Sequence, residues 1–214
     1  MIVYGSSLSP FVRKVLAFAA EKGLEVELRP TGLGSKDPEF LEASPFGKMP
    51  GFRDGDFAIS DSSAIVAYLD AIEPEPRLIP EEPRARARTI WFDEYADTIL
   101  FGCGQKMFFN RIVAPRFLGR PGDEEAATKA ECEELPPLLD YLERVIPESG
   151  FLVEDRVTLA DISVASPFAN LRHLDYALDP ARHPRLAHYI QTILDRPSFK
   201  GWIDRETAFL QRAA

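Results

Sequence analysis

A cluster of prolines divides this sequence into two parts with different patterns. The prolines are Pro74, Pro76, Pro80 and Pro83, and they lie among acidic side chains. Proline lacks a backbone N–H and fixes φ, so the segment that holds them cannot form a long helix. Strand and helix signals alternate before this segment, and helical periodicity dominates after it. We therefore predict two domains, residues 1–73 and 84–214, joined by a linker at 74–83.

The first part reads as a small α/β unit. Ser9 and Pro10 supply an N-cap and a first-turn proline for a helix that ends at Gly23. Asp54 and Gly55 form a dipeptide that favours the tight turn of a β-hairpin. The expected strands are residues 1–4, 25–29 and the two arms of 52–59, and the expected helices are residues 10–23, 38–43 and 62–72.

The second part reads as helical throughout. A Gly-Arg-Pro-Gly break at residues 119–122 separates its first two helices. The expected helices are residues 84–117, 124–146, 159–174, 184–194 and a last one from 197. The predicted fold class is therefore an α/β N-terminal domain followed by an all-helical C-terminal domain.

Charge and hydropathy exclude several classes of protein. The chain has 214 residues and a net charge of −9, and its Lys and Arg side chains are scattered rather than gathered in a stripe that would follow a phosphate backbone. No apolar run reaches the roughly 20 residues of a membrane helix, and no signal peptide opens the sequence. We predict a soluble cytoplasmic protein with no nucleic-acid partner and no membrane association.

The cysteine and histidine residues do not form a metal-binding pattern. Cys103 and Cys132 are the only cysteines, and their unlike contexts indicate free thiols. His173, His183 and His188 lack the spacing of metal ligands, and no serine or acid motif completes a hydrolytic triad. We therefore predict no metal.

Two dipeptides in the first part predict a cradle for a small peptide. A proline after Met49, if the bond is cis, turns the N–H and C=O of Met49 outward as an edge for an extended ligand. Asp61 and Ser62 stand where a helix begins, where free N–H groups attract a carboxylate and Asp61 accepts an ammonium group. Glutathione has this combination of groups. Helix capping alone also explains Asp61 and Ser62.

Ser9 is the candidate for stabilising a bound thiolate. A hydroxyl at the mouth of a helix can donate to an anion, and the helix dipole adds positive potential there. A role as N-cap alone is the alternative. Tyr4 at the end of the first strand, and Ser6 and Ser7 in the loop that follows, are rivals for the same role.

The long helix that opens the second part is rich in aromatic side chains. Core packing explains most of them, and the excess beyond one packing stripe predicts an apolar substrate pocket. The residues assigned to this pocket are Phe11, Tyr95, Ile99, Cys103 and Met107.

Four blocks of the chain resemble the cytosolic glutathione transferase family, and the likeness covers nearly its whole length. The blocks are SPFVRKV at 9–15, PFGKMP at 45–50, DGDFAISDSSAI at 54–65 and FLVEDRVTLAD at 151–161. Their occurrence in family order makes the resemblance specific. It implies a thioredoxin-like N-terminal domain with a cis Pro50, and a cytosolic homodimer. Phe46 is similar to an aromatic residue that some classes insert into the partner subunit.

The resemblance also implies roles for individual residues. Ser9 would activate the glutathione thiol, as in the serine-type classes, and Met49 would pair through its backbone with the cysteinyl part. Asp61 and Ser62 would hold the γ-glutamyl end, and Lys48 would reach the glycyl carboxylate. Serine rather than cysteine at position 9 favours attack by the thiolate over disulfide exchange.

The expected function is conjugation of the glutathione thiolate to small apolar electrophiles, with glutathione as co-substrate. Two alternatives remain open. One is another glutathione-dependent reaction on the same frame, such as isomerisation, ether cleavage or dehalogenation. The other is a binding or scaffold protein without turnover, because fold does not determine reaction.

Overall fold

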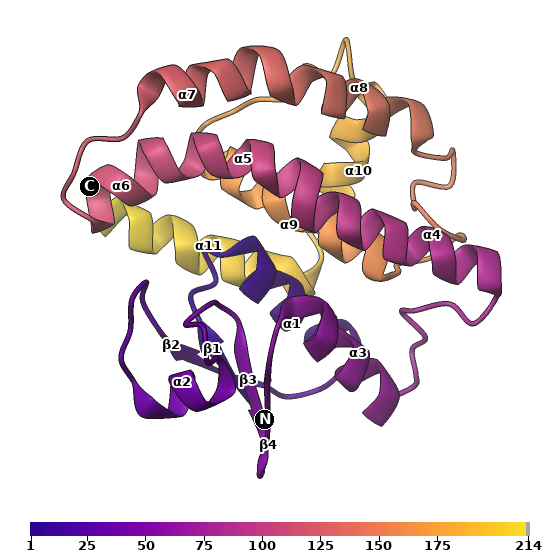
Figure 1. The fold of residues 1–214 in the computed structure, drawn as a ribbon. Coiled ribbons are helices and arrows are strands. Elements are labelled where there is room, and N and C mark those ends of the chain that lie inside the picture. Colours follow the sequence, from indigo (N-terminus) through magenta and orange to yellow (C-terminus); the bar gives the residue numbers. More distant parts are fainter. Residues whose placement is uncertain (213–214) are drawn as a thin grey trace.

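The computed structural model describes residues 1–212 as a small sheet with helices on both faces, followed by a larger group of helices (Figure 1). The strands are β1 (Ile2–Gly5), β2 (Glu27–Pro30), β3 (Gly51–Asp54) and β4 (Phe57–Ser60), in the order β2-β1-β3-β4. β1 pairs with β2 in parallel and with β3 antiparallel, and β3 and β4 form the expected hairpin.

Three helices cover this sheet. α1 (Pro10–Glu21) and α3 (Ser62–Ile72) lie between the sheet and the second group of helices, whereas α2 (Pro38–Ala43) packs on the other face against β3 and β4 (Figure 1). α2 and α3 have the bounds that the sequence predicts. Both begin where an aspartate, Asp37 or Asp61, accepts hydrogen bonds from the N–H groups of the first turn.

Residues 73–82 connect the two parts without a helix, and the next helix begins at Pro83. This segment also contributes buried side chains and a backbone hydrogen bond to the second part. Leu78 and Ile79 are buried, and the C=O of Leu78 accepts the N–H of Leu159 at 2.9 Å. The segment is therefore fastened to the start of a helix far along the chain.

The second part consists of helices, as predicted. Two of its long helices contain π turns, here labelled η, that interrupt the regular hydrogen bonding without ending the helix. A π turn holds one extra residue, so the side chains beyond it are rotated by about 100° from the faces of a regular helix. The elements are α4 (Pro83–Glu94), η1 (Tyr95–Leu100), α5 (Phe101–Phe108), η2 (Phe109–Val113), α6 (Ala114–Phe117), α7 (Glu124–Lys129), η3 (Ala130–Glu134), α8 (Leu135–Val145), α9 (Leu159–His173), α10 (Pro184–Leu194) and α11 (Pro197–Arg212).

α9 is the centre of the hydrophobic core. Every one of its residues from 159 to 171 is buried. A helix with no solvent-facing side needs neighbours all round it, and α9 packs against α1, α4, α5 and α10. The contact with α1 joins the two parts of the chain.

Asp161 closes the start of α9 with a capping box, in which Thr158 is the N-cap residue. Its carboxylate accepts the N–H groups of Leu152 and Thr158, both at 2.9 Å. It also accepts the hydroxyls of Thr158 at 3.1 Å and Tyr189 at 3.2 Å. Burial raises the pKa of Asp161 to about 6, although these four donors favour the ionised form.

Asp161→Asn should change how the free energy of unfolding depends on pH. The pKa of Asp161 is about 6 in the folded chain, above its ordinary value of 3.8. The folded chain therefore binds this proton more tightly than the unfolded chain does. The resulting stabilisation is fully present below about pH 4 and is lost as pH rises through 6. Over that window the free energy of unfolding of the wild type should fall by about 3 kcal/mol relative to that of Asp161→Asn. Both values are measured by urea unfolding at fixed protein concentration.

The exposed Glu148 supplies the control, because Glu148→Gln removes a carboxyl group that makes no hydrogen bond within the described residues. That variant should keep the pH dependence of the wild type. A difference between wild type and Asp161→Asn that stays constant, or grows, from pH 4 to 6 would contradict the raised pKa of Asp161.

Candidate active site

Ser9 stands immediately before α1, with its side chain at a cavity. Its backbone, at φ −76° and ψ 124°, is extended, and its N–H donates to the C=O of Ser6 at 2.9 Å. The Ser9 hydroxyl makes no hydrogen bond to the first turn of α1. Because the dipole of this 12-residue helix puts positive potential at its start, the hydroxyl is placed to donate to an anion in the cavity.

The loop before β3 brings Met49 to the same cavity. The Met49–Pro50 peptide bond is cis. The residue before Met49 is Lys48, and Ser44 holds its backbone. Ser44 Oγ accepts the N–H of Lys48 at 3.0 Å and donates to the C=O of Lys48 at 2.6 Å. Met49 lines the cavity, whereas Lys48 is exposed, Pro50 is buried, and neither lines it.

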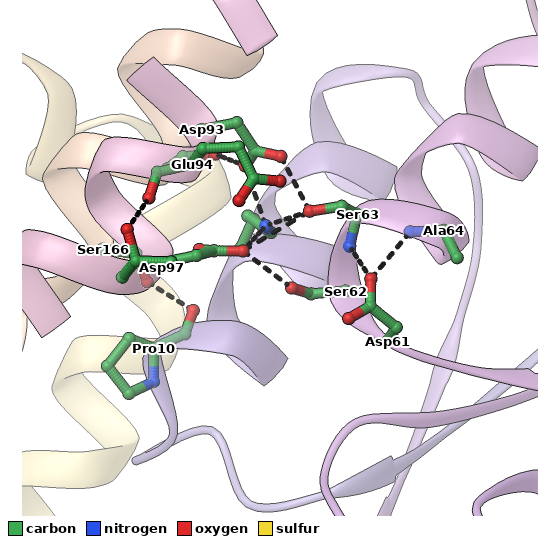
Figure 2. Close-up of polar contacts among 12 residues, drawn as sticks. Pro10, Asp61, Ser62, Ser63, Ala64, Asp93, Glu94, Asp97 and Ser166 are labelled. Carbon is green, nitrogen blue, oxygen red and sulfur yellow. Dashed lines mark hydrogen bonds and ion pairs between the residues drawn. The ribbon is translucent and has the colours of Figure 1, made fainter. Parts of the chain in front are cut away.

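Asp61 caps α3 from a backbone conformation that is rare outside glycine. Its φ is 81°, and its Oδ1 accepts the N–H groups of Ser63 and Ala64 at 3.0 and 3.1 Å (Figure 2). These two amides are therefore not free for a ligand, which corrects the sequence-based expectation. Asp61 itself is exposed, and its Oδ2 makes no hydrogen bond within residues 1–212. That oxygen can accept an ammonium group from outside.

Ser62 is buried and belongs to a polar cluster between the two parts of the chain (Figure 2). Lys14 of α1 donates to Asp93 Oδ1 at 2.8 Å and to Asp97 Oδ2 at 2.6 Å. The hydroxyl of Ser62 donates to Asp97 at 3.3 Å, and that of Ser63 donates to Asp93 at 2.7 Å. The start of α3 is thus joined to the long helix of the second part.

The polar cluster contains one cation and two carboxylates. Its members are Lys14, Asp93, Asp97, Ser62 and Ser63. Burial raises the pKa of Asp97; Lys14 opposes this rise and Asp93 adds to it. Asp93 is almost completely buried and also accepts the hydroxyl of Ser163 at 2.6 Å. The Asp97 side chain is 19% exposed, so it is the more accessible of the two carboxylates.

A cavity of about 520 Å³ lies between the loops of the first part and the helices of the second. Its polar lining consists of hydroxyl and amide groups from Ser6, Ser9, Thr31, Gln105 and Asn170, and none of its lining residues is charged. A cavity of this size with few polar groups suits a small apolar molecule. Its large apolar lining side chains are Leu8, Leu33, Met49, Phe101, Phe108, Phe109, Phe117, Leu118 and Phe209.

None of the five residues assigned to a substrate pocket from the sequence lines this cavity. Tyr95, Cys103 and Met107 are buried in the hydrophobic core, and burial raises the pKa of the Cys103 thiol to about 11. Ile99, within η1, is 49% exposed. Three of the four helix residues chosen from the sequence therefore face the core, and the fourth, Ile99, faces solvent. Phe11 packs against Phe101, which does line the cavity, with ring centroids 4.4 Å apart.

The rivals of Ser9 are placed differently. Tyr4 is fully buried in a small core under α2, and its hydroxyl donates to Glu39 at 3.2 Å. Ser6 lines the cavity, but its Oγ accepts the N–H of Leu8 at 3.4 Å. Ser7 does not line the cavity. Ser9 alone among these four combines a position at a helix start with access to the cavity.

Several residues near the site were missed from the sequence. Asp93 and Asp97 stand four residues apart in a stretch that also holds Trp91, Phe92 and Tyr95, and this spacing places both carboxylates on one helix face. That pattern was available as a signal. Lys14 and Ser44 gave no such signal, because their roles depend on partners that only the fold brings near them.

Cys103 and Cys132 are free thiols, as predicted. Within residues 1–212, no helix is long and apolar enough to cross a membrane. Over the same described range, no group of three or more His, Cys, Asp or Glu side chains is arranged to hold a metal ion.

Comparison with known proteins gives consistent matches. The family model for the glutathione S-transferase N-terminal domain matches residues 3–77, and the model for the C-terminal domain matches residues 108–206. Glutathione S-transferase 3 of Zea mays is 31% identical over 205 residues, covering 94% of this chain and 86% of its own. A glutathione S-transferase of Hyoscyamus muticus is 29% identical, covering 95% and 98%.

A solved structure agrees with these matches. Glutathione transferase F7 from Populus trichocarpa has a TM-score of 0.82 to this chain at 26% identity, covering 95% of this chain and 97% of its own. Both parts of the present fold, the mixed sheet and the helices that follow it, lie within the matched region. The chain therefore belongs to the glutathione S-transferase family of transferases.

Proposed function

We propose that this enzyme conjugates the glutathione thiolate to small apolar electrophiles, with Ser9 as its catalytic residue. One observation carries the proposal: Ser9, with its hydroxyl free of the helix cap, and Met49 of the cis-proline loop line a single uncharged cavity with aromatic walls. The hydroxyl and the start of α1 would stabilise the thiolate. The cavity would hold the electrophilic carbon within about 3 to 3.5 Å of the sulfur, and the leaving group would depart with its electron pair.

Glutathione would bind along the adjoining edge of the first part. The backbone of Met49, a residue that lines the cavity, would pair with the cysteinyl residue. The open Oδ2 of Asp61 would accept the γ-glutamyl ammonium group, and the N–H of Ser62 would donate to its carboxylate. The exposed Lys48 would reach the glycyl carboxylate. The exposure of Asp61 and Lys48 supports the two contacts assigned to their side chains.

The same site serves other reactions that begin with a glutathione thiolate. Isomerisation, ether cleavage and dehalogenation differ in the electrophile rather than in how the thiolate is held. A scaffold protein would fold alike and show no turnover. A panel of these substrate classes assayed with glutathione separates the three readings, and conjugation of simple aryl halides is the expected activity.

A cytosolic homodimer completes the proposal. Phe46 is 89% exposed, and an aromatic side chain left in water has no stabilising role within one chain. Its position on the loop before Met49 supports insertion into a second copy. Such an assembly would bring the partner subunit close to the glutathione-binding edge.

Ser9→Ala should raise the pKa of the enzyme-bound glutathione thiol by about 1 to 2 units, because the thiolate loses a hydrogen-bond donor. At pH 7, kcat/KM with chlorodinitrobenzene should fall about 10- to 100-fold, with KM for glutathione changed less than about twofold. The thiolate is followed by its ultraviolet absorbance across a pH titration. Ser7→Ala, a nearby serine away from the cavity, is the matched control; an equal loss there, or none in Ser9→Ala, would remove Ser9 from the mechanism.

Asp61→Asn tests the charge at the start of α3 without removing the cap. Asparagine tolerates positive φ and its Oδ1 can still accept from Ser63 and Ala64. KM for glutathione should rise about tenfold or more, since a charge-assisted hydrogen bond contributes about 1.5 to 3 kcal/mol. The melting temperature should change little. Asp61→Ala should add a loss of about 1 kcal/mol of stability, and an unchanged KM in Asp61→Asn would place the ammonium group elsewhere.

The uncharged cavity predicts discrimination against acidic electrophiles. Relative to the uncatalysed rates, kcat/KM for chlorodinitrobenzene should exceed that for its carboxylated counterpart, chlorodinitrobenzoate, by about tenfold or more, because no lining cation offsets the desolvation of the carboxylate. Gln105→Lys puts a cation in the lining and should narrow this ratio. Equal rates for both substrates in the wild type would show that the electrophile does not enter this cavity.

A further inference from the structure

Ser9 is held in place from the second part of the chain. The carbonyl groups on either side of it belong to Leu8 and Pro10. Asn170 Nδ2 donates to the C=O of Leu8 at 2.9 Å, and Ser166 Oγ donates to the C=O of Pro10 at 2.7 Å (Figure 2 shows the second contact). Both donors are buried side chains of α9, about one turn apart.

Arg13 fixes which way the Asn170 amide points. Its Nη1 donates to Asn170 Oδ1 at 2.9 Å. A guanidinium group has donors and no acceptors, so the amide oxygen must face Arg13. The amide nitrogen is then left to donate to Leu8. The orientation of this amide therefore follows from the chemistry of its neighbours.

Arg13 is itself held by a buried carboxylate. Its Nε and Nη2 donate to the two oxygens of Glu206 of α11 at 3.1 and 2.7 Å, and its Nη1 also donates to the C=O of Ser166 at 2.7 Å. Burial would raise the pKa of Glu206, but Arg13 and the nearby His173 keep it below its ordinary value. The carboxylate stays charged, and the guanidinium stays fixed.

The remaining backbone groups at Ser9 are bonded locally. Its N–H donates to Ser6, and its C=O accepts the N–H of Arg13 at 3.0 Å. The peptide groups on both sides of Ser9 are therefore tied down, while its hydroxyl has no hydrogen-bond partner within the described residues. The position of the Cβ atom that carries that hydroxyl is set by the backbone, and so by the groups that hold the backbone. A displacement of about 1 Å is enough to impair a catalytic contact.

We infer that Ser166 and Asn170 are positioning residues that set the place of the Ser9 hydroxyl against the glutathione sulfur, with Arg13 and Glu206 orienting the Asn170 amide. The inference rests on the proposed function, in which Ser9 donates to the thiolate. Ser166 does not line the cavity, so any effect of its substitution on the thiolate passes through the loop.

Two variants each remove one tether. Ser166→Ala deletes the donor to Pro10, and Asn170→Ala deletes the donor to Leu8 without adding a charge to the cavity lining, while Arg13 keeps the C=O of Ser166 as an acceptor. Each should raise the pKa of the bound glutathione thiol by about one unit, a large part of the shift in Ser9→Ala, with KM for glutathione changed less than about twofold. Because the two variants are independent, one that fails to fold leaves the other to decide.

Ser198→Ala is the matched control. Ser198 is also a buried serine of the second part whose hydroxyl reaches α1, donating to Glu21 at 2.5 Å, but at the opposite end of that helix from Ser9. Ser198→Ala should lower the free energy of unfolding about as much as Ser166→Ala does, and it should leave the pKa of the bound thiol at the wild-type value. An equal pKa shift in Ser198→Ala would mean that general loosening of α1 is the cause, and the inference would be overturned.

The double variants Ser9→Ala/Ser166→Ala and Ser9→Ala/Asn170→Ala separate the inference from the proposed function. If the tethers act through Ser9, their effect on the thiol pKa disappears when Ser9 is already alanine. Undiminished effects in that background, or wild-type pKa values in both single variants while Ser9→Ala shifts, overturn the inference and leave the role of Ser9 intact. No shift in Ser9→Ala itself removes that role, and the inference with it.

Discussion

The buried ion pair of Arg13 and Glu206 is the interaction on which the join between the two parts depends. Both side chains are almost completely removed from water, and Nη2 and Oε2 lie 2.7 Å apart. Loss of either partner would leave the other charge buried and unpaired, which costs about 3 to 5 kcal/mol. Four hydrogen bonds join Arg13 to the second part, two to Glu206 and one each to Ser166 and Asn170. The pair therefore fixes one helix of the sheet domain against two helices of the other.

α9 forms hydrogen bonds to several regions around the candidate site. Its first turn is bonded to the segment at 73–82, since the N–H of Leu159 donates to the C=O of Leu78. Ser163 reaches Asp93 in the polar cluster at the start of α3. Ser166 and Asn170 then reach the loop that carries Ser9. A single buried helix thus contacts the segment between the domains, the region where the γ-glutamyl group is proposed to bind, and the loop of the proposed catalytic serine.

Local signals predicted the elements well, because capping residues, prolines and glycines act within a turn. α2 and α10 have the predicted bounds, and α1 begins at the proline that follows Ser9. The cavity wall was not predictable in the same way. Its residues depend on the face that α5 presents after η1, and no local signal announces that one-residue insertion. The ties of the Ser9 loop to α9 span more than 150 residues of sequence and need the fold itself.

The buried contacts between α1, α9 and α11 limit how the two domains can be recombined. The N-terminal and C-terminal parts match two separate family models, which invites exchange of the helical part as a separate module. Here the exchanged piece would also carry the acceptor for Arg13 and both side chains that hold the Ser9 loop. A chimera with a foreign helical domain would retain its glutathione site only if residues equivalent to Ser166, Asn170 and Glu206 came with it. Substitutions at these positions and at Arg13 are expected to vary together during divergence.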